Sequence, residues 1–495
     1  MSISLLLEMA VDGFGDRPAC GMGADALTYH QLFDRAQSLA RVLRERPGEK
    51  VVFLGLNSAA MPVTLLASAL AGKPFVPLNY RLSDDQLAAL LHRCAPALLV
   101  VDEDMLNRVP AIDGNELVNL AGAAGEPLQS PAADEDIAVL LFTSGTTGEP
   151  KAAVLRHGNL SSYVMGTVDF MGAEEGECSL ISVPPYHIAA VSNVLSALYA
   201  GRRIIQLPAF DPDEWVRVVA GEGVTHAMVV PTMLDRILGV LARGNIALPA
   251  LRHLSYGGGR MPVETISRAM EMLPEVDFVN AYGLTETSST IALLTPQDHR
   301  MARSSSDPSV KQRLASVGKP LPSIELEVRD AAGKPVAAGE PGEIFVRGAQ
   351  VSGEYLGKAG GGAGWFATRD SGYLDAQGYL FLEGRLDDVI VRGGENISPG
   401  EIELALQAHP AIAEAAVVGV PSVEWGEAIA AVVVARPGQT VDPAELRSWV
   451  AARLRSSKAP ALVVVRQELP YSETGKLLRR VLKSELNRVA TEAAI

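Results

Sequence analysis

The order of apolar and polar positions divides the chain into three parts. Up to about residue 230, short apolar runs alternate with longer segments whose apolar positions recur at helical spacing. The first pattern is typical of buried strands and the second of amphipathic helices, so their alternation predicts βαβ units and a parallel sheet. The predicted strands are residues 51–56, 74–77, 98–102, 179–183, 203–207 and 227–230, and the predicted helices include 61–71, 83–92 and 212–221.

The rest of the chain shows two further patterns. Between about 317 and 382, short alternating runs such as 324–328 and 342–346 are separated by Gly, Pro and Asp, which indicates antiparallel strands. After about 386, the pattern predicts a small α+β domain. Its strands are 415–420, 428–435 and 461–465, and its helices are 399–408 and 443–455.

The length of the chain calls for more than one domain, because 495 residues exceed one ordinary core. We predict a large N-terminal domain, residues 1–386, which includes a β-rich subdomain at about 317–382. Residues 387–495 form a small C-terminal domain. The predicted fold class is α/β.

Composition narrows the function classes. A net charge of −15 argues against a nucleic-acid or anionic-membrane partner, since such partners need basic patches. Three widely spaced cysteines support neither a disulfide framework nor a zinc site, so a reducing cytoplasm is expected. The N-terminus lacks a basic region ahead of a long apolar run, which argues against a secretory signal. The uncharged runs at 51–72 and 178–201 are interrupted by Pro and polar residues, so we expect no membrane span.

Residues 141–151, LFTSGTTGEPK, end an apolar run with two glycines, four hydroxyls and one lysine. Glycine lets backbone N–H groups approach a ligand, and hydroxyls and a lysine suit a polyphosphate. A solvated turn is the alternative, and the spacing does not fit the G-x-x-x-x-G-K-[ST] phosphate loop. The candidate phosphate ligands are Thr143, Ser144, Gly145, Thr146, Thr147, Gly148 and Lys151.

A second candidate lies at 183–190, VPPYHIAA. The double proline predicts an extended turn that aims Tyr186 and His187 out of a strand end, where ligands bind in open α/β sheets. A buried core histidine is the alternative.

Two later motifs carry further chemistry. Residues 256–261, YGGGRM, could lay a flat ring against bare glycine backbone, or form an ordinary loop. In 280–287, NAYGLTET, Tyr282 can stack on adenine, Thr285 can bond an α-phosphate, and Glu286 offers a hard oxygen to Mg²⁺. A capped helix start would explain Thr285 and Glu286 without a ligand.

Together these motifs resemble those of the adenylate-forming superfamily of acyl-CoA synthetases, luciferases and adenylation domains. Four later motifs also resemble that family, in its order: WFATRDSG at 365–372, EGRLDDVI at 383–390, RGGENISPGE at 392–401 and PYSETGK at 470–476. WGE at 425–427 matches the CoA-ligase pattern. The resemblance covers about 25–485.

The resemblance implies two mixed sheets flanked by helices in the large domain, a mobile small domain, and a set of site residues. It implies that Lys476, Thr285, Glu286 and His187 are catalytic, with Mg²⁺ on Glu286. It implies that ATP or AMP is bound by the phosphate loop and by Gly258, Gly259, Arg260, Asn280, Ala281, Tyr282, Gly283, Thr285, Asp370, Arg385 and Lys476. It implies an acyl pocket of Tyr186, His187, Ile188, Val191, Gly257, Gly258, Gly283 and Ser288. CoA would contact Gly393, Gly394, Glu395 and Trp425, and the small domain would turn about Asp387.

The chain departs from the family pattern at two residues. Arg369 replaces the usual glycine of 365–372. This replacement affects the backbone geometry there, and the arginine could add a positive charge near the nucleotide. Ala152 stands where a glycine commonly follows the lysine.

The implied function is an ATP-dependent acid–CoA ligase that uses ATP, Mg²⁺ and CoA. The motif at 184–190 contains no acid, which argues against an amino-acid substrate. The expected partner is an apolar carboxylic acid, either aryl or cinnamic or a medium-chain fatty acid. A luciferase-like oxidase, an adenylation enzyme that loads a carrier protein, and a nucleotide-binding sensor stay open, as does a homodimer.

Overall fold

The computed structural model describes residues 1–120, 122–143, 150–244, 246–358, 364–393, 395–422, 424–472 and 477–493. The chain divides into two compact units. The first contains Met1–Glu325 and Val346–Phe366, and the second contains Leu326–Phe345 and Ala367–Ile495.

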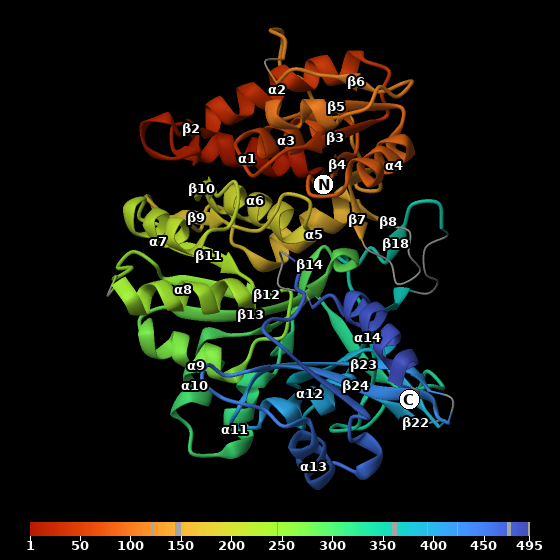
Figure 1. Ribbon diagram of the computed structural model, residues 1–495. Coiled ribbons are helices and arrows are strands. Elements are labelled where there is room, and N and C mark those ends of the chain that lie inside the picture. Colours follow the sequence, from red (N-terminus) through yellow and green to blue (C-terminus); the bar gives the residue numbers. More distant parts are fainter. Residues whose placement is uncertain are drawn as a thin grey trace. The chain divides into compact units, whose positions relative to one another are not determined.

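The first unit contains a mixed nine-stranded sheet (Figure 1). Its strands, in spatial order, are β15 (Lys319–Pro320), β14 (Ser289–Leu294), β13 (Asp277–Leu284), β12 (His253–Gly257), β11 (His226–Val229), β9 (Cys178–Ile181), β10 (Arg203–Gln206), β1 (Pro18–Cys20) and β2 (Leu27–Thr28). The strands from β13 to β1 run parallel, while β14, β15 and β2 are antiparallel to their neighbours.

A mixed seven-stranded sheet completes the β-structure of the first unit. Its order is β18 (Glu354–Tyr355), β8 (Lys151–Arg156), β7 (Ile137–Thr143), β4 (Phe75–Pro77), β3 (Lys50–Leu54), β5 (Ala97–Val101) and β6 (Glu116–Leu117). The strands from β7 to β6 are parallel, and β8 and β18 add an antiparallel edge.

Helices pack on both sheets, because the apolar faces of the sheets must be shielded from water. The helices of this unit are α1 (Ile3–Phe14), α2 (Tyr29–Glu45), α3 (Ala60–Ala71), α4 (Asp84–Cys94), α5 (His157–Thr167), α6 (Ile188–Ala200), α7 (Pro212–Gly221), α8 (Pro231–Gly244), α9 (Val263–Met272), α10 (Pro296–Ser304) and α11 (Pro308–Gln312). α1, α2, α3, α5 and α6 share one buried core with residues of both sheets. α7, α8 and α9 form another with the nine-stranded sheet.

Local signals begin and end these helices where the sequence pattern places them. Thr28 and Ser83 cap α2 and α4 by accepting hydrogen bonds from Gln31 and Gln86 backbone N–H groups. Gly201, with φ 90°, ends α6 in the left-handed conformation that glycine adopts without strain.

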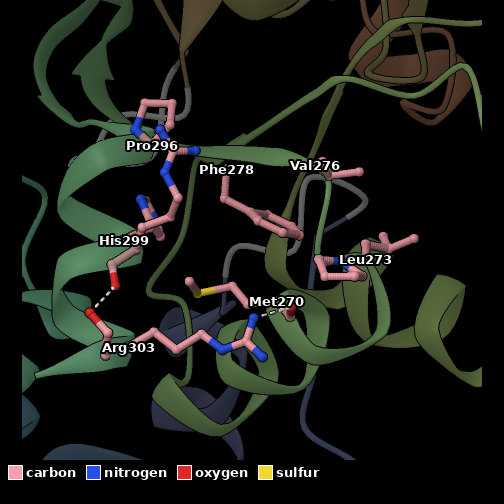
Figure 2. Close-up of a pocket in the computed structure, with 10 residues that line it drawn as sticks. Met270, Leu273, Val276, Phe278, Pro296, His299 and Arg303 are labelled. Atoms are coloured by element: carbon pink, nitrogen blue, oxygen red, sulfur yellow. Dashed lines mark hydrogen bonds between the residues drawn. The ribbon is translucent and has the colours of Figure 1, made fainter.

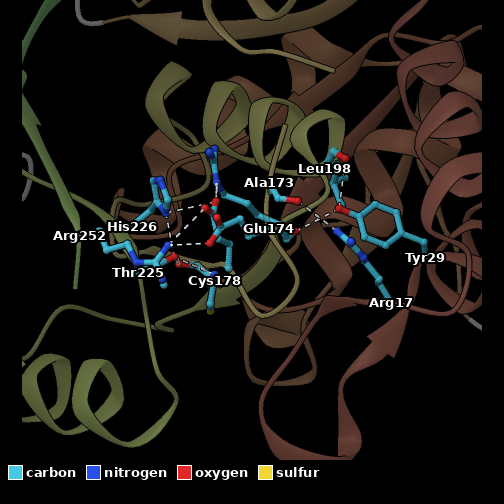
Figure 3. A network of polar contacts seen from close by, with 11 residues as sticks. Arg17, Tyr29, Ala173, Glu174, Cys178, Leu198, Thr225, His226 and Arg252 are labelled. Carbon is cyan, nitrogen blue, oxygen red and sulfur yellow. Dashed lines mark hydrogen bonds and ion pairs between the residues drawn. The ribbon is translucent and has the colours of Figure 1, made fainter. Parts of the chain in front are cut away.

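A polar network lies at the N-terminal ends of the parallel strands (Figure 3). Thr225, just before β11, donates its hydroxyl to the Cys178 carbonyl over 3.0 Å and lies 2.8 Å from His226 Nδ1. Arg252, just before β12, pairs with Glu174 over 3.1 Å. The candidate ligand residues follow the C-terminal ends of the strands. The polar network and the candidate ligand residues therefore lie at opposite ends of the parallel strands.

The second unit contains two smaller sheets. The four-stranded sheet has the order β16 (Glu325–Arg329), β17 (Gly342–Arg347), β19 (Phe366–Leu374) and β20 (Leu380–Arg385). The other sheet has the order β22 (Glu395–Ile397), β21 (Ile390–Arg392), β24 (Gly426–Ala435) and β23 (Ile412–Ser422), with β25 (Leu462–Arg466) paired to β24. Its helices are α12 (Pro399–Gln407), α13 (Pro443–Arg453) and α14 (Arg479–Ala493).

The predicted strands and helices are all present, with their ends shifted by a few residues. The two units divide the chain at other points than residue 386, because the β-rich segment groups with the C-terminal segment. Contacts such as that of Ser398 Oγ with the Glu383 carbonyl, 3.3 Å apart, join the β-rich segment to the C-terminal segment. The domain boundary at 386 and the mobility of the small domain stay predictions.

Candidate active site

The two ends of the predicted phosphate loop are held together by a β-hairpin. Thr143 ends β7 and Lys151 begins β8, and the two residues are paired in the ladder. Thr143 Oγ1 donates to the Lys151 carbonyl over 3.3 Å. The loop residues Ser144, Gly145, Thr146, Thr147 and Gly148 lie outside the described residues.

Lys151 and Glu286, the predicted cation and Mg²⁺ ligand, meet at Tyr355. The Lys151 Nζ lies 5.8 Å from the centre of the Tyr355 ring, and the Tyr355 hydroxyl donates a hydrogen bond to Glu286 Oε1. The Glu286 side chain is buried, and its backbone carbonyl accepts from the Ser352 and Gly353 N–H groups over 2.9 and 3.0 Å. β18 pairs with β8, and this pairing brings Tyr355 beside Lys151. Tyr355 belongs to none of the predicted motifs.

Glu286 fits the role of a Mg²⁺ ligand. Mg²⁺ that is bound to nucleotide phosphates keeps several waters and takes only one or two protein carboxylates. The buried Glu286 carboxylate could supply one such ligand, since one of its oxygens is held in place by Tyr355.

The two glycine-rich motifs lie side by side at the C-terminal ends of β12 and β13, where Gly257 pairs with Ala281. A Cβ atom at Gly257 would lie 2.3 Å from the Ala281 carbonyl oxygen, and one at Gly283 would lie 1.8 Å from the Ser289 carbonyl oxygen. Sheet packing therefore requires both glycines, with or without a ligand. Gly258, with φ 76°, Gly259 and Arg260 are exposed beyond the strand end.

The remaining residues of the 280–287 motif are largely fixed by neighbours. Asn280 is buried and donates its amide to the Ser316 carbonyl over 3.0 Å. The Tyr282 ring is 9% exposed, which leaves little of it open to stack on a base in this conformation. Thr285 begins a short 3₁₀ turn, Thr285–Thr287, and is half-buried.

The predicted acyl-pocket residues gather around the N-terminal end of α6. His187 occupies the N-cap position of this helix without a side-chain cap hydrogen bond, and its ring lies 4.7 Å from that of Tyr186. The Tyr186 ring packs edge-on against Tyr80, 5.6 Å away, and burial raises the pKa of its hydroxyl. Ile188 and Val191 belong to the first turns of α6. Tyr80 was absent from the sequence prediction.

Ser288 joins this region through its neighbour. The Ser289 hydroxyl lies 3.2 Å from the Ser192 hydroxyl on α6, so β14 and α6 are linked. Ser288 has φ 56°, and its buried hydroxyl has no hydrogen-bond partner among the described residues. The first unit thus brings together the acyl-pocket candidates from α6, β12 and the turn after β13.

In the second unit, Asp370 and Arg385 are paired residues of β19 and β20, and Arg385 Nε lies 2.8 Å from Asp370 Oδ1. Asp387 follows β20, and its Oδ1 accepts from Arg369 Nη2 over 2.8 Å. Asp370, a predicted nucleotide ligand, and Asp387, the predicted hinge residue, are therefore each held by an arginine of the β19–β20 hairpin.

The CoA candidates also lie together in this unit. The Gly393 N–H donates to the Trp425 carbonyl over 2.8 Å, and a Cβ atom at Gly393 would lie 2.9 Å from the indole. The Arg392 guanidinium lies 4.8 Å from the centre of the indole, whose side chain is 43% exposed. Glu395 pairs with Arg455 over 2.8 Å. Gly394 and Lys476 lie outside the described residues.

A separate pocket of about 320 Å³ lies between α9, β13 and α10 (Figure 2). Its lining includes Met270, Phe278, His299 and Arg303, and no predicted site residue. His299 connects its wall to the glycine-rich motif, because its Nε2 lies 2.8 Å from the Tyr256 hydroxyl.

Comparison with known proteins shows the family of the chain. Residues 7–356 match the AMP-binding enzyme family, and residues 401–476 match the AMP-binding enzyme C-terminal domain. The chain belongs to the AMP-binding enzyme family. The predicted adenylate-forming, acyl-CoA ligase type and the α/β fold class are thereby confirmed.

Relatives within this family differ in their acceptors. A feruloyl-CoA synthase of an Amycolatopsis species is 35% identical over 92% of this chain and 93% of its own. A fatty acid–[acyl-carrier-protein] ligase of Streptomyces coeruleorubidus is 31% identical over 94% and 93%. The structure of a Bacillus subtilis o-succinylbenzoate CoA synthetase with ATP and magnesium has a TM-score of 0.82 and 28% identity, over 97% of this chain and 99% of that one. No helix in the described part of this chain is long and apolar enough to cross a membrane.

Proposed function

We propose that this AMP-binding enzyme joins an apolar carboxylic acid to CoA in two steps that consume ATP. The observation that carries the proposal is the grouping of Lys151, Tyr355 and Glu286. The Lys151 ammonium lies over the Tyr355 ring, and the Glu286 carboxylate accepts a hydrogen bond from the hydroxyl of the same residue. Such a pair suits the charge of a nucleotide polyphosphate. The relatives named feruloyl-CoA synthase and 2-succinylbenzoate–CoA ligase support a ligase of this class.

The first step must bring together two anions, the substrate carboxylate and the ATP α-phosphate. They repel each other in water, so the site has to supply positive charge and orientation. Lys151 and the loop before it would hold the β- and γ-phosphates, and Lys476 would bridge the two reacting anions. Mg²⁺ on Glu286 would neutralise phosphate charge. A carboxylate oxygen attacks the α-phosphorus, the bond to pyrophosphate breaks, and an acyl-adenylate forms.

In the second step the CoA thiolate attacks the activated carbonyl carbon. The carbon–sulfur bond forms as the bond to the AMP oxygen breaks. Gly393 and Trp425 would line the thiol's path, with Arg392 beside the indole.

The protein's own thiols are poor candidates for a covalent intermediate. Cys20, Cys94 and Cys178 are all buried. Burial raises their pKa values to about 12, 11 and 11 respectively, so they stay protonated at neutral pH.

For the acid, we propose an aryl acid of the cinnamic type ahead of a medium-chain fatty acid. The half-buried Tyr186 and His187 place two rings at the N-terminal end of α6, and the buried Tyr80 packs edge-on against Tyr186. Such aromatic side chains favour stacked or edge-on contact with a planar ring. The feruloyl-CoA synthase relative supports the same class. A cytoplasmic location and a homodimer stay predictions.

Two assays test the proposal. Exchange of labelled pyrophosphate into ATP should depend on an added acid, with cinnamic-type acids the most active. AMP release should then require CoA. No exchange with any acid would refute adenylation. Exchange with AMP release only on an acyl carrier protein would assign the chain to the carrier-loading class instead, as for the Streptomyces relative.

A further inference from the structure

Arg369 adopts a backbone conformation that ordinary residues avoid. It lies within β19 with φ 63°, in the left-handed region that favours glycine. The family motif has a glycine at this position. The chain therefore keeps a long cationic side chain where a glycine would fit without strain, which directs attention to what this side chain contacts.

The Arg369 guanidinium lies between two carboxylates. Its Nη2 donates to Asp387 Oδ1 over 2.8 Å, and its Nη1 lies 3.8 Å from Glu343 Oε1 on β17. That Glu343 oxygen is buried and has no hydrogen-bond partner among the described residues. Arg369 thus reaches from β19 to the neighbouring strand β17 and to Asp387, two residues after the end of β20.

Asp388, the residue after Asp387, is held by a different arginine. Asp388 Oδ2 lies 3.3 Å from Nε of Arg479, at the start of α14. Arg479 also pairs with the buried Glu403 of α12 and donates to the Val417 carbonyl of β23 over 2.9 Å. Two adjacent carboxylates, Asp387 and Asp388, are therefore bound to arginines that belong to different parts of the second unit.

We propose that Arg369 is a positioning residue that latches the side chain of the hinge residue Asp387 to β19. This inference rests on the proposed two-step function and on the turn of the small domain about Asp387 that the family resemblance implies between the steps. Rotation about φ of Asp387 would carry its carboxylate away from Arg369, whereas rotation about ψ leaves the carboxylate in place. The latch therefore favours a turn confined to ψ of Asp387 and the residues after it.

The latch biases the hinge and does not lock it. The Arg369 and Asp387 side chains are 54% and 27% exposed, and ion pairs at such positions change an equilibrium by about two- to fivefold. The same exposure makes the contact sensitive to salt, because added ions screen it.

The test uses the full-length protein without substrates, so its outcome does not depend on the enzymatic activity. Amide hydrogen exchange is measured for residues 386–391 in the wild type, in Arg369→Gly, in Asp387→Asn and in the double variant. Arg369→Gly should fold, since its φ suits glycine. We expect two- to fivefold faster exchange in each single variant and no further gain in the double variant. High salt should bring the wild type to the same rates.

Arg466→Gln is the matched control, because Arg466 pairs with Glu485 over 2.7 Å at similar exposure elsewhere in the same unit. It should leave exchange at 386–391 unchanged. Unchanged exchange in Arg369→Gly, or additive effects in the double variant, would overturn the latch. Failure of pyrophosphate exchange would refute the proposed function, while the amide hydrogen exchange at 386–391 could still be interpreted.

Discussion

Replacing Tyr355 by phenylalanine should weaken Mg²⁺ binding while the fold is kept. The substitution removes one hydroxyl, which donates to Glu286 Oε1, and keeps the ring beside Lys151. The Glu286 backbone stays fixed by the Ser352 and Gly353 N–H groups. The change therefore acts on the carboxylate alone and frees it to leave the orientation that suits the metal.

The size of the effect follows from the burial of Glu286, whose side chain is 8% exposed. A hydrogen bond to a charged group contributes about 1.5–3 kcal/mol, and loss of a partner that orients a metal ligand typically costs about 10- to 100-fold in metal affinity. We expect the Mg²⁺ concentration for half-maximal pyrophosphate exchange to rise by about this factor. The rate at saturating Mg²⁺ should fall less.

The assay titrates Mg²⁺ at fixed ATP and acid, and calorimetry of ATP binding over the same Mg²⁺ range gives a readout independent of turnover. Tyr163→Phe, on α5 against the core, is the matched control and should show wild-type Mg²⁺ dependence. A Tyr355→Phe protein with lowered thermal stability and unchanged Mg²⁺ dependence would show that the bond is only structural. That result would refute our reading of Glu286.

Three further predictions concern other parts of the chain. Lys476→Ala should abolish pyrophosphate exchange and largely spare thioester formation from a supplied acyl-adenylate, and equal loss of both steps would contradict its assignment to the first. Trp425→Ala removes a half-exposed indole beside Gly393 and should raise KM for CoA about 2- to 10-fold with little change in KM for ATP, as CoA titrations can check. Burial is the main cause that lowers the pKa of His226 from 6.5 to about 3, so the unfolded chain binds a proton that the folded chain excludes. Stability should fall as pH drops from 6.5 toward 3, by about 2 kcal/mol between pH 6.5 and 5 in urea unfolding, and His226→Gln should flatten that slope.

The sequence predicted the parallel part of the fold well because its signals are local. Each βαβ unit carries its own alternation of apolar run and amphipathic helix, and caps such as Thr28 and Ser83 mark helix starts within a few residues. The antiparallel edge was harder to predict. β18 has only two residues, and it pairs with β8, which lies far earlier in the chain. A segment this short has no periodicity to recognise.

The same limit applies to the site. Motifs identified Glu286, whereas its partner Tyr355 is 69 residues away and belongs to no motif that we recognised. Arg369 was noticed as a departure from the pattern, but its contact with Asp387 depends on how β19 and β20 pair, which composition does not specify. Sequence reasoning named candidate groups and missed contacts that hold them, such as those of Tyr355 with Glu286 and of Arg369 with Asp387.

Different physical constraints fix the glycines and the carboxylates of the motifs. Gly257 and Gly283 are required by neighbouring backbone, so their presence alone is weak evidence for a ligand. The carboxylates Glu286 and Asp387 each lie in a 3₁₀ turn and accept a hydrogen bond from a strand residue distant in sequence. A carboxylate that is already oriented loses less conformational entropy when it binds a ligand or takes part in a conformational step. Packing of a core does not require such orientation. The stronger evidence for a functional site is therefore the oriented acid, and Tyr355 and Arg369 are the residues whose replacement tests it most directly.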